Sequence, residues 1–159
     1  MKNIVGKISI FLLLILLGGC SATGEKFVTP ALINEDTATV YLMRQDKFLG
    51  AAGCRDVLIN EVDFGCIKNA GFLKIEILPG NKTITLPKVT ENDWANETSV
   101  EQNFERGGIY YYEWTHELED FYVIPAGSIV VTGGKTKASI IKHSKASALP
   151  ILKELRDSN

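Results

Sequence analysis

The sequence predicts an all-β protein, an antiparallel β-sandwich of about seven to nine short strands with a short C-terminal α-helix. Apolar and polar residues alternate over short runs, turn signals recur at intervals of about ten residues, and no helical period appears until the end of the chain. The chain has 159 residues, and its hydrophobic content of 45% is enough for one core, which excludes a disordered chain.

The first residues predict a lipoprotein signal peptide ahead of the sandwich. Two lysines precede an apolar run over residues 8–17, and Gly18, Gly19 and Cys20 follow it. As a helix this run rises about 15 Å, about half the hydrocarbon thickness of a bilayer, so it is too short for a permanent span. A charged start, a short apolar middle and a small-residue exit are typical of a secretory signal, so we expect residues 1–19 to be removed.

The motif Leu17-Gly18-Gly19-Cys20 resembles the lipobox of bacterial lipoproteins. The resemblance implies that the Cys20 thiol carries a diacylglycerol group and that the chain is cut just before this cysteine. We expect no cofactor beyond these covalent acyl chains. A plain secreted protein with a cysteine here by chance is the alternative. Ser21 stands where an aspartate would favour the inner membrane, so the resemblance implies an outer-membrane, periplasm-facing protein if the host has two membranes.

Residues 20–36 show little periodicity and contain one glycine and one proline, so they predict a lipidated N-terminus followed by a tether. Docking of the apolar side chains of this segment on the domain, Phe27 among them, is the alternative. The predicted organisation is a signal peptide over residues 1–19, this tether, and a sandwich domain with its helix over residues 37–159.

Each predicted strand is a short β-rich run between turn residues. The runs are residues 39–44, 57–59, 62–64, 72–78, 83–86, 99–104, 109–115, 121–124, 129–132 and 138–141. Asn60-Glu61 is predicted to be the turn of a hairpin between the second and third runs. Apolar and charged residues alternate from Leu73 to Ile77, which predicts a strand with one face in the core. Pro79-Gly80-Asn81 then turns the chain into the next run.

The most aromatic run contains Tyr110-Tyr111-Tyr112 and Trp114. Alternation places Tyr110, Tyr112 and Trp114 on one face of the strand. Tyr111 and Glu113 then lie on the other face. We expect core packing for this strand, and an aromatic platform for glycan or peptide binding is the alternative.

Residues 147–157 form the segment with a helical period. Pro150 suits a first helical turn, and Leu149, Leu152 and Leu155 recur on one side. We expect this helix to pack on the sandwich, with binding of a partner or a membrane surface as the alternative.

Cys54 and Cys66 lie six residues to either side of Asn60, where the hairpin turn is predicted. Cross-strand partners in a hairpin have this spacing, and an oxidising cell envelope allows a disulfide between them. We therefore predict a structural disulfide, with two buried free thiols as the alternative. A reactive pair is disfavoured because the chain has no closely spaced redox motif.

The net charge of −2 gives no general attraction to nucleic acid, so we expect no nucleic-acid partner. The charge is unevenly distributed. Residues 91–120 carry nine acidic side chains and Arg106 alone, whereas residues 121–159 carry six basic and two acidic side chains. These two segments could attract each other within the domain or present one acidic and one basic face to partners.

The sequence offers no motif for catalysis or for a metal. Residues 116–120, His-Glu-Leu-Glu-Asp, are the densest group of ligand types and are predicted to form a surface turn. Zinc needs three or four nitrogen or sulfur ligands, and only His116 and His143 supply a ring nitrogen, so we expect no metal site. Residues 133–136, Gly-Gly-Lys-Thr, lack the leading glycine and the following helix of a phosphate loop, so a hairpin turn is predicted there.

Four blocks of strand and turn residues carry a family resemblance. They are residues 38–44, residues 57–65, residues 77–80 with 83–85, and residues 107–112. Together they resemble an uncharacterised family of bacterial lipoproteins, the domain of unknown function 2846. Similar blocks occur in small sandwich domains of the PEGA type, where a Pro-Gly turn follows an alternating strand. The resemblance spans about residues 37–115 and implies an anchored β-sandwich in the cell envelope, with no activity or catalytic residue.

We therefore expect a non-enzymatic, lipid-anchored envelope protein with a binding or scaffolding role. Its expected partners are the membrane, through the lipid, and an envelope protein or peptidoglycan. A module that binds a small ligand, peptide or glycan at the sandwich end is the first alternative, and Trp94 is its candidate binding residue because it lies in a polar segment. A divergent enzyme that uses the acidic cluster from Glu113 to Asp120 is the second.

Overall fold

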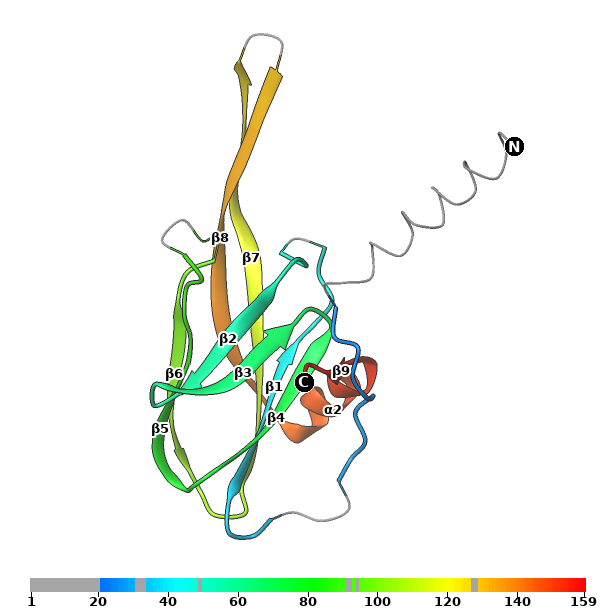
Figure 1. Ribbon diagram of the computed structural model, residues 1–159, viewed down its shortest axis with the longest axis vertical. Helices are drawn as coiled ribbons and strands as arrows, with labels where there is room; N and C mark the ends of the chain where they lie inside the picture. Colours follow the sequence, from blue (N-terminus) through cyan, green and yellow to red (C-terminus); the bar gives the residue numbers. More distant parts are fainter. Residues whose placement is uncertain (1–20, 31–33, 49, 91–92, 94, 127–128) are drawn as a thin grey trace, which may run out of the picture.

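The computed structural model describes residues 21–30, 34–48, 50–90, 93, 95–126 and 129–159. Residues 1–20, with the predicted signal peptide and Cys20, and the candidate binding residue Trp94 lie outside the described residues. The described chain forms two β-sheets packed face to face with one helix outside them, so the predicted all-β sandwich with a C-terminal helix is confirmed (Figure 1).

Nine strands make up the two sheets in the described part of the chain. They are β1 (Ala38–Arg44), β2 (Cys54–Ile59), β3 (Val62–Lys68), β4 (Gly71–Ile77), β5 (Gly80–Leu86), β6 (Thr98–Phe104), β7 (Ile109–Ala126), β8 (Ile129–His143) and β9 (Arg156–Asp157). One sheet has the order β8-β7-β1-β4-β9 and the other has the order β3-β2-β5-β6. Most neighbours are antiparallel, but β1 runs parallel to β7 and β4 runs parallel to β9, so the five-stranded sheet is mixed.

The core lies between the two sheets, and alternation along each strand builds it. In β4, Leu73 and Ile75 are buried in this core, while Lys74 and Glu76 are exposed, as the sequence predicts. In β7, Tyr112 and Trp114 are also buried between the sheets. The other large buried members of this core are Leu42, Ile67, Ile84, Leu86 and Phe104. Core packing is therefore the role of the aromatic strand.

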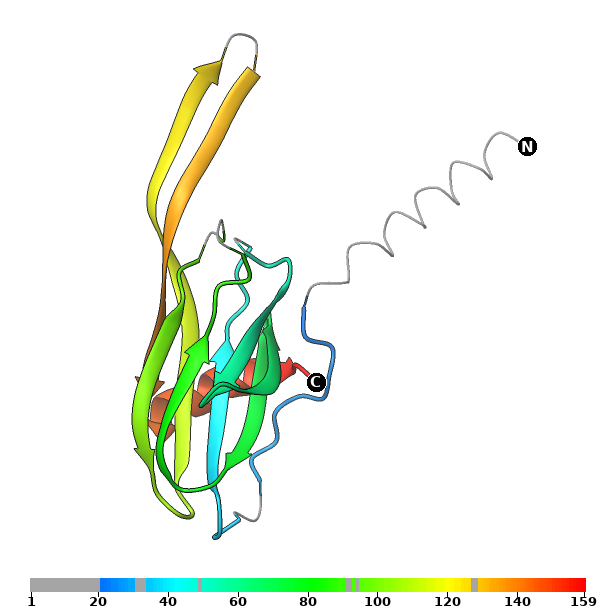
Figure 2. The ribbon, with the colours of Figure 1, turned by 60° about the vertical axis from the view of Figure 1, so that its left-hand side comes forward.

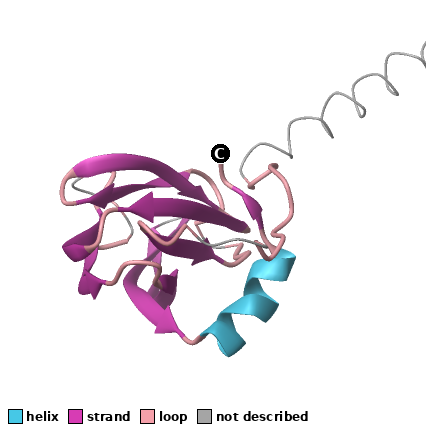
Figure 3. Cartoon of the chain, turned by 90° about the horizontal axis from the view of Figure 1, so that it is seen from below, coloured by secondary structure: helices cyan, strands magenta, loops and turns pink. Residues whose placement is uncertain are grey.

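The helix α2 (Lys145–Glu154) packs on the outer face of the five-stranded sheet (Figure 3). Leu152 and Leu155 are buried there against side chains that point away from the sandwich core, including Tyr41 and Tyr111. The predicted packing of the helix on the sandwich is therefore confirmed. Successive side chains point to opposite faces of a strand, so β1 and β7 contribute both to the core between the sheets and to the cluster under the helix.

The helix begins two residues earlier than predicted. The hydroxyl of Ser144 accepts a hydrogen bond from the Ser147 amide at 3.2 Å and caps the helix, so Pro150 lies inside it rather than in its first turn. The helix ends at Glu154, because the chain then becomes extended and pairs with β4 as β9.

Residues 21–27 lie against the domain. Backbone hydrogen bonds join this segment to Asn69 and Asp157, and an isolated bridge pairs Lys26 with β9. The ring of Phe27 packs edge-on against Tyr41, with 5.4 Å between the ring centroids. Docking, the alternative to a tether, therefore describes this segment.

Strands β7 and β8 are longer than the predicted runs and form one hairpin. The pairing continues from Tyr111 opposite His143 to Ala126 opposite Ile129. Beyond the sandwich this hairpin projects as a two-stranded ribbon, which we call the arm and define as residues 117–126 and 129–137 (Figure 2). The four runs predicted from residue 109 onward, apart from the helix, thus belong to two strands.

Two predicted turns lie inside these strands, so both predictions are wrong. Residues 116–120 belong to β7 and residues 133–136 belong to β8. The register shifts between Leu118 and Asp120, and Gly134 lies beside this bulge. A Cβ atom at Gly134 would lie 2.6 Å from the Asp120 carbonyl oxygen, so glycine here permits close backbone approach rather than a turn.

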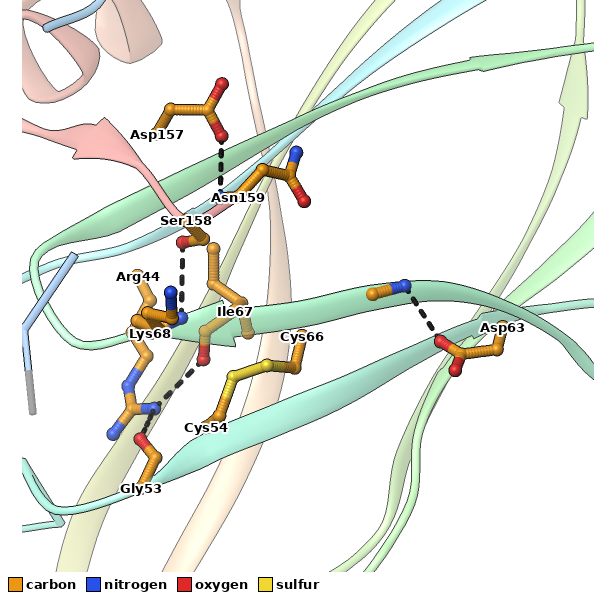
Figure 4. Close-up of a disulfide and its surroundings, with 11 residues drawn as sticks. Arg44, Gly53, Cys54, Asp63, Cys66, Ile67, Lys68, Asp157, Ser158 and Asn159 are labelled. Carbon is orange, nitrogen blue, oxygen red and sulfur yellow. Dashed lines mark hydrogen bonds between the residues drawn. A yellow bond between two sulfur atoms is a disulfide. The ribbon is translucent and has the colours of Figure 1, made fainter. Parts of the chain in front are cut away.

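The structure joins Cys54 and Cys66 in a disulfide, with their Cα atoms 5.5 Å apart (Figure 4). The hairpin turn is at Asn60-Glu61, as predicted, and both residues have positive φ angles, which is typical of a type I′ turn. The two cysteines are not directly opposite each other: Cys54 lies opposite Lys68, and Cys66 lies opposite Asp56. The disulfide therefore runs diagonally across the hairpin.

Replacing both Cys54 and Cys66 with serine should lower the free energy of unfolding by about 3 kcal/mol, because the disulfide closes a short loop of the unfolded chain. Denaturant unfolding of the variant and of the oxidised and reduced wild type measures this. The reduced wild type should match the variant. Two free thiols in the denatured, unreduced protein would contradict the disulfide.

Leu152→Ala should lower the free energy of unfolding by about 2–5 kcal/mol, because the buried leucine joins the helix to the sheet. The neighbouring Lys153 is exposed, so Lys153→Ala serves as the matched control and should change stability by less than about 0.5 kcal/mol. Equal stabilities for the two variants in thermal or denaturant unfolding would show that the helix does not contribute to the fold in this way.

Candidate functional site

A cavity of about 330 Å³ opens at one end of the sandwich. It lies between the loop that follows β1 and the loop that joins β5 to β6. Its lining residues are Arg44, Gly50, Ala52, Gly53, Cys54, Arg55, Val89, Thr90, Asp93 and Trp114. Two arginines and an aspartate thus meet a buried tryptophan at the end of an otherwise apolar core.

Arg44 is the last residue of β1 and is only 3% exposed. Its Nη1 donates to the carbonyl oxygens of Gly53 at 3.3 Å and Ile67 at 3.2 Å (Figure 4). Its Nη2 donates to the carbonyl oxygen of Gly50. Within the described residues, no carboxylate forms an ion pair with Arg44. Backbone carbonyls alone therefore hold this cation at the cavity.

Arg55, the second residue of β2, is also 3% exposed, but it has a carboxylate partner. Both of its Nη atoms donate to the carboxylate of Asp93, and Nη1 also donates to the Pro87 carbonyl at 3.0 Å. The backbone amides of Val89 and Ala95 also donate hydrogen bonds to the Asp93 carboxylate. This ion pair ties β2 to the loop between β5 and β6.

The indole of Trp114 lies close to both guanidinium groups. The Cζ atom of Arg44 is 5.1 Å from its ring centroid, and that of Arg55 is 5.2 Å away. An indole face attracts cations, so the ring offsets part of the repulsion between the two arginines. Trp114 is therefore both a core residue and a wall of the cavity.

Burial shifts the pKa values of two groups here. Desolvation, helped by the charge of Arg55, lowers the pKa of Arg44 to about 10, so Arg44 stays protonated at neutral pH. Burial alone would raise the pKa of Asp93, but hydrogen bonds from Arg55 and from two backbone amides outweigh it, so this pKa lies below its usual value. Among its described residues the site therefore holds two cations and one carboxylate at neutral pH.

The cluster from Glu113 to Asp120 is spread along β7. Alternation places Trp114 and His116 on one face, where their ring centroids are 5.3 Å apart, and Glu113 on the other. Glu113 is buried and is hydrogen-bonded to Gln45 at 2.8 Å and to His143 at 2.9 Å. Within the described residues, no three His, Cys, Asp or Glu side chains lie together as a group that could hold a metal.

The arm is the second unusual surface. Among the side chains of the arm that the structure describes, Leu118, Phe121, Val123 and Ile124 are large, apolar and at least half exposed. Residues 121–134 contain no charged side chain. At the base of the arm the register places Glu117 opposite Lys137 and Asp120 opposite Lys135. The acidic and basic segments of the sequence therefore face each other within the domain at this point.

Sequence reasoning missed Arg44 and Arg55, although it placed a binding site at the sandwich end. The available signal was that Arg44 follows four apolar residues, 40–43, which places a cation at the end of a strand expected to be buried. The glycines at positions 50 and 53, both with positive φ angles, let the following loop turn its carbonyls toward that cation.

Among the described residues, no helix has the length and apolar character needed to cross a bilayer. The model of a family described as Protein of unknown function (DUF2846) matches residues 34–134, more than half of the sequence, in agreement with the resemblance of its strand and turn blocks. No curated protein and no solved structure matches the chain.

Asp93→Asn should lower the free energy of unfolding at neutral pH by about 2 kcal/mol, because it removes charged hydrogen bonds and leaves Arg55 without its carboxylate. The folded-state pKa of Asp93 is depressed, so its contribution is present above the unfolded-state pKa of about 3.9 and is lost as the pH falls through the folded-state value.

The difference between wild type and Asp93→Asn in denaturant unfolding should therefore shrink below about pH 4. Glu97 is exposed in the same loop, and Glu97→Gln should change stability by less than about 0.5 kcal/mol. A difference for Asp93→Asn that is constant from neutral to acidic pH would contradict the role of the charge.

Proposed function

The chain belongs to this family of proteins of unknown function, and we propose that it is a lipid-anchored envelope protein with a non-enzymatic binding or scaffolding role. The proposal attaches acyl chains to Cys20 and directs the sandwich to the periplasmic side of the outer membrane if the host has two membranes. The exposed apolar arm is the observation that carries the binding role.

The position of the docked N-terminal segment supports an arm that points toward the membrane. Ser21 forms an isolated bridge with Asn69, whose side-chain oxygen accepts a hydrogen bond from the Lys47 amide at 3.1 Å. The Nζ of Lys47 in turn donates to Thr115 and to the His116 carbonyl, where β7 leaves the sandwich. The chain therefore enters the domain at Ser21 near the end from which the arm projects, and a lipid one residue earlier would lie on the same side.

The backbone of the arm favours a protein over lipid as its partner. Strand β8 is at the edge of its sheet, and beyond Glu113 the other edge of β7 has no partner strand among the described residues. The interior of a bilayer offers no hydrogen-bond partners for such edges, whereas a protein strand can pair with them. We therefore assign the arm to a protein that is held at the same membrane and presents a strand edge beside an apolar surface.

Cys20→Ser should move the protein from the envelope pellet to the soluble fraction after cell disruption, because fatty chains on this thiol provide the anchor. Fractionation with immunoblotting measures the distribution. Cys54→Ser is the control that removes a different cysteine and should leave the protein in the pellet. If processed Cys20→Ser protein pelleted like wild type, the anchor would be wrong.

A photo-activated cross-linker at Phe121 should give a discrete protein adduct in intact cells, whereas one at the exposed Glu101 of β6 should not. Ile124→Asp should abolish the adduct, because it places a charge on the apolar arm, and Ile124→Val should preserve it. Both changes are at an exposed position, so thermal unfolding should match that of the wild type. Adducts with lipid alone, or equal adducts from both positions, would contradict a protein partner.

A further inference from the structure

The donors of Arg44 are only partly used. A guanidinium has five N–H donors, and three backbone carbonyls accept from Arg44, which leaves two. One of the two is on Nε, which is buried and has no hydrogen-bond partner in the described part of the chain. A buried donor without an acceptor is costly, so a site that keeps one unpaired is built for something that the protein itself does not supply.

The charges of the described lining residues also indicate a missing anion. Among the described lining residues the two guanidinium groups face one carboxylate, Asp93, whose oxygens are both engaged by Arg55. Among the described residues no carboxylate forms an ion pair with Arg44, so burying its positive charge carries a desolvation cost. The lowered pKa of Arg44 reflects this cost, and a bound anion would offset it.

The remaining walls favour an organic anion. Ala52, Val89 and the Trp114 ring give the cavity an apolar side next to the cation, and Thr90 adds a hydroxyl. A volume of about 330 Å³ lies at the lower end of small-molecule sites. The planar fork of a guanidinium matches a carboxylate, which accepts two parallel hydrogen bonds.

We propose that this cavity binds a small organic carboxylate, whose charged group pairs with the spare N–H donors of Arg44 and whose apolar part lies against Trp114. This goes beyond the binding of a protein by the arm and depends neither on the arm nor on the lipid. The carboxylate belongs to a free acid or to the C-terminal end of a short peptide, and the probes below distinguish these two sources.

The test uses the full chain in a non-ionic detergent. The chain has two tryptophans, so the emission is measured in the wild-type chain and again in Trp94→Phe, in which Trp114 is the single reporter. Hexanoate represents a free acid and N-acetylalanine a peptide end, and hexanamide and N-acetylalaninamide are their neutral counterparts. At constant ionic strength, at least one acid should change the Trp114 emission saturably, and its amide should not. The acid that binds more tightly identifies the source.

Two positions test the site itself. Ala52 is exposed at the cavity wall, so Ala52→Leu fills the cavity without touching the contacts of Arg44, and Ala52→Ser is the matched control. Ala52→Leu should weaken binding of the acid at least about tenfold, while Ala52→Ser should retain the wild-type affinity within about threefold. Arg44→Lys keeps the charge but loses the fork and should also weaken binding, with thermal unfolding as the check on folding.

Three results would overturn the proposal. They are no saturable response to either acid, equal responses to an acid and its amide, and an acid response that Ala52→Leu leaves unchanged. A response to inorganic phosphate that exceeds the response to both acids would also reject a carboxylate as the ligand. Loss of acid binding in the arm variant Ile124→Asp would show that the cavity and the arm are not independent, contrary to the proposal.

Discussion

The parallel pairing of β1 with β7 is the constraint on which the rest of the structure depends. Met43 lies opposite Glu113 in this register, so both strands run toward the same end of the sandwich. Because β1 stops at Arg44 while β7 continues to Ala126, the buried guanidinium and the arm are found at that one end. The docked segment that begins at Ser21 reaches the same end. A single backbone pairing thus gathers the cavity, the arm and the proposed attachment to the membrane.

The cavity shows how a sandwich of this size accommodates buried charge. Carbonyl dipoles and an indole face replace part of the water that Arg44 loses, whereas Arg55 receives a full carboxylate from Asp93. The two arginines lie against the same ring but are neutralised to different degrees. An apolar pair at these positions would give a simpler and more stable core, since burying an ion pair seldom adds net stability. Arg55 has a carboxylate partner and Arg44 has only carbonyl oxygens, so we attribute the buried Arg44 to ligand binding rather than to the stability of the fold.

The sequence predicts the local features of the fold because they depend on neighbours along the chain. Three such local features were predicted: the alternation from Leu73 to Ile77, the turn at Asn60-Glu61 and the leucines of the helix. The continuity of β7 and β8 was not predictable, because Gly134 has the composition of a turn while serving a close approach to a bulge. The parallel pairing and the meeting of Arg44 with Trp114 join residues far apart in sequence, so no local pattern carries them.

The contact between residues 21–27 and the C-terminal strand has a consequence for the order of events in folding. The amide of Gly24 donates to the carbonyl of Asp157, and the amide of Asp157 donates to the carbonyl of Glu25. Residues near the start of the described chain therefore complete their hydrogen bonds with residues that are translated much later. Domains form as units while the chain emerges from its N-terminal side. The hydrogen bonds between Gly24, Glu25 and Asp157 can therefore form only after Asp157 has been translated.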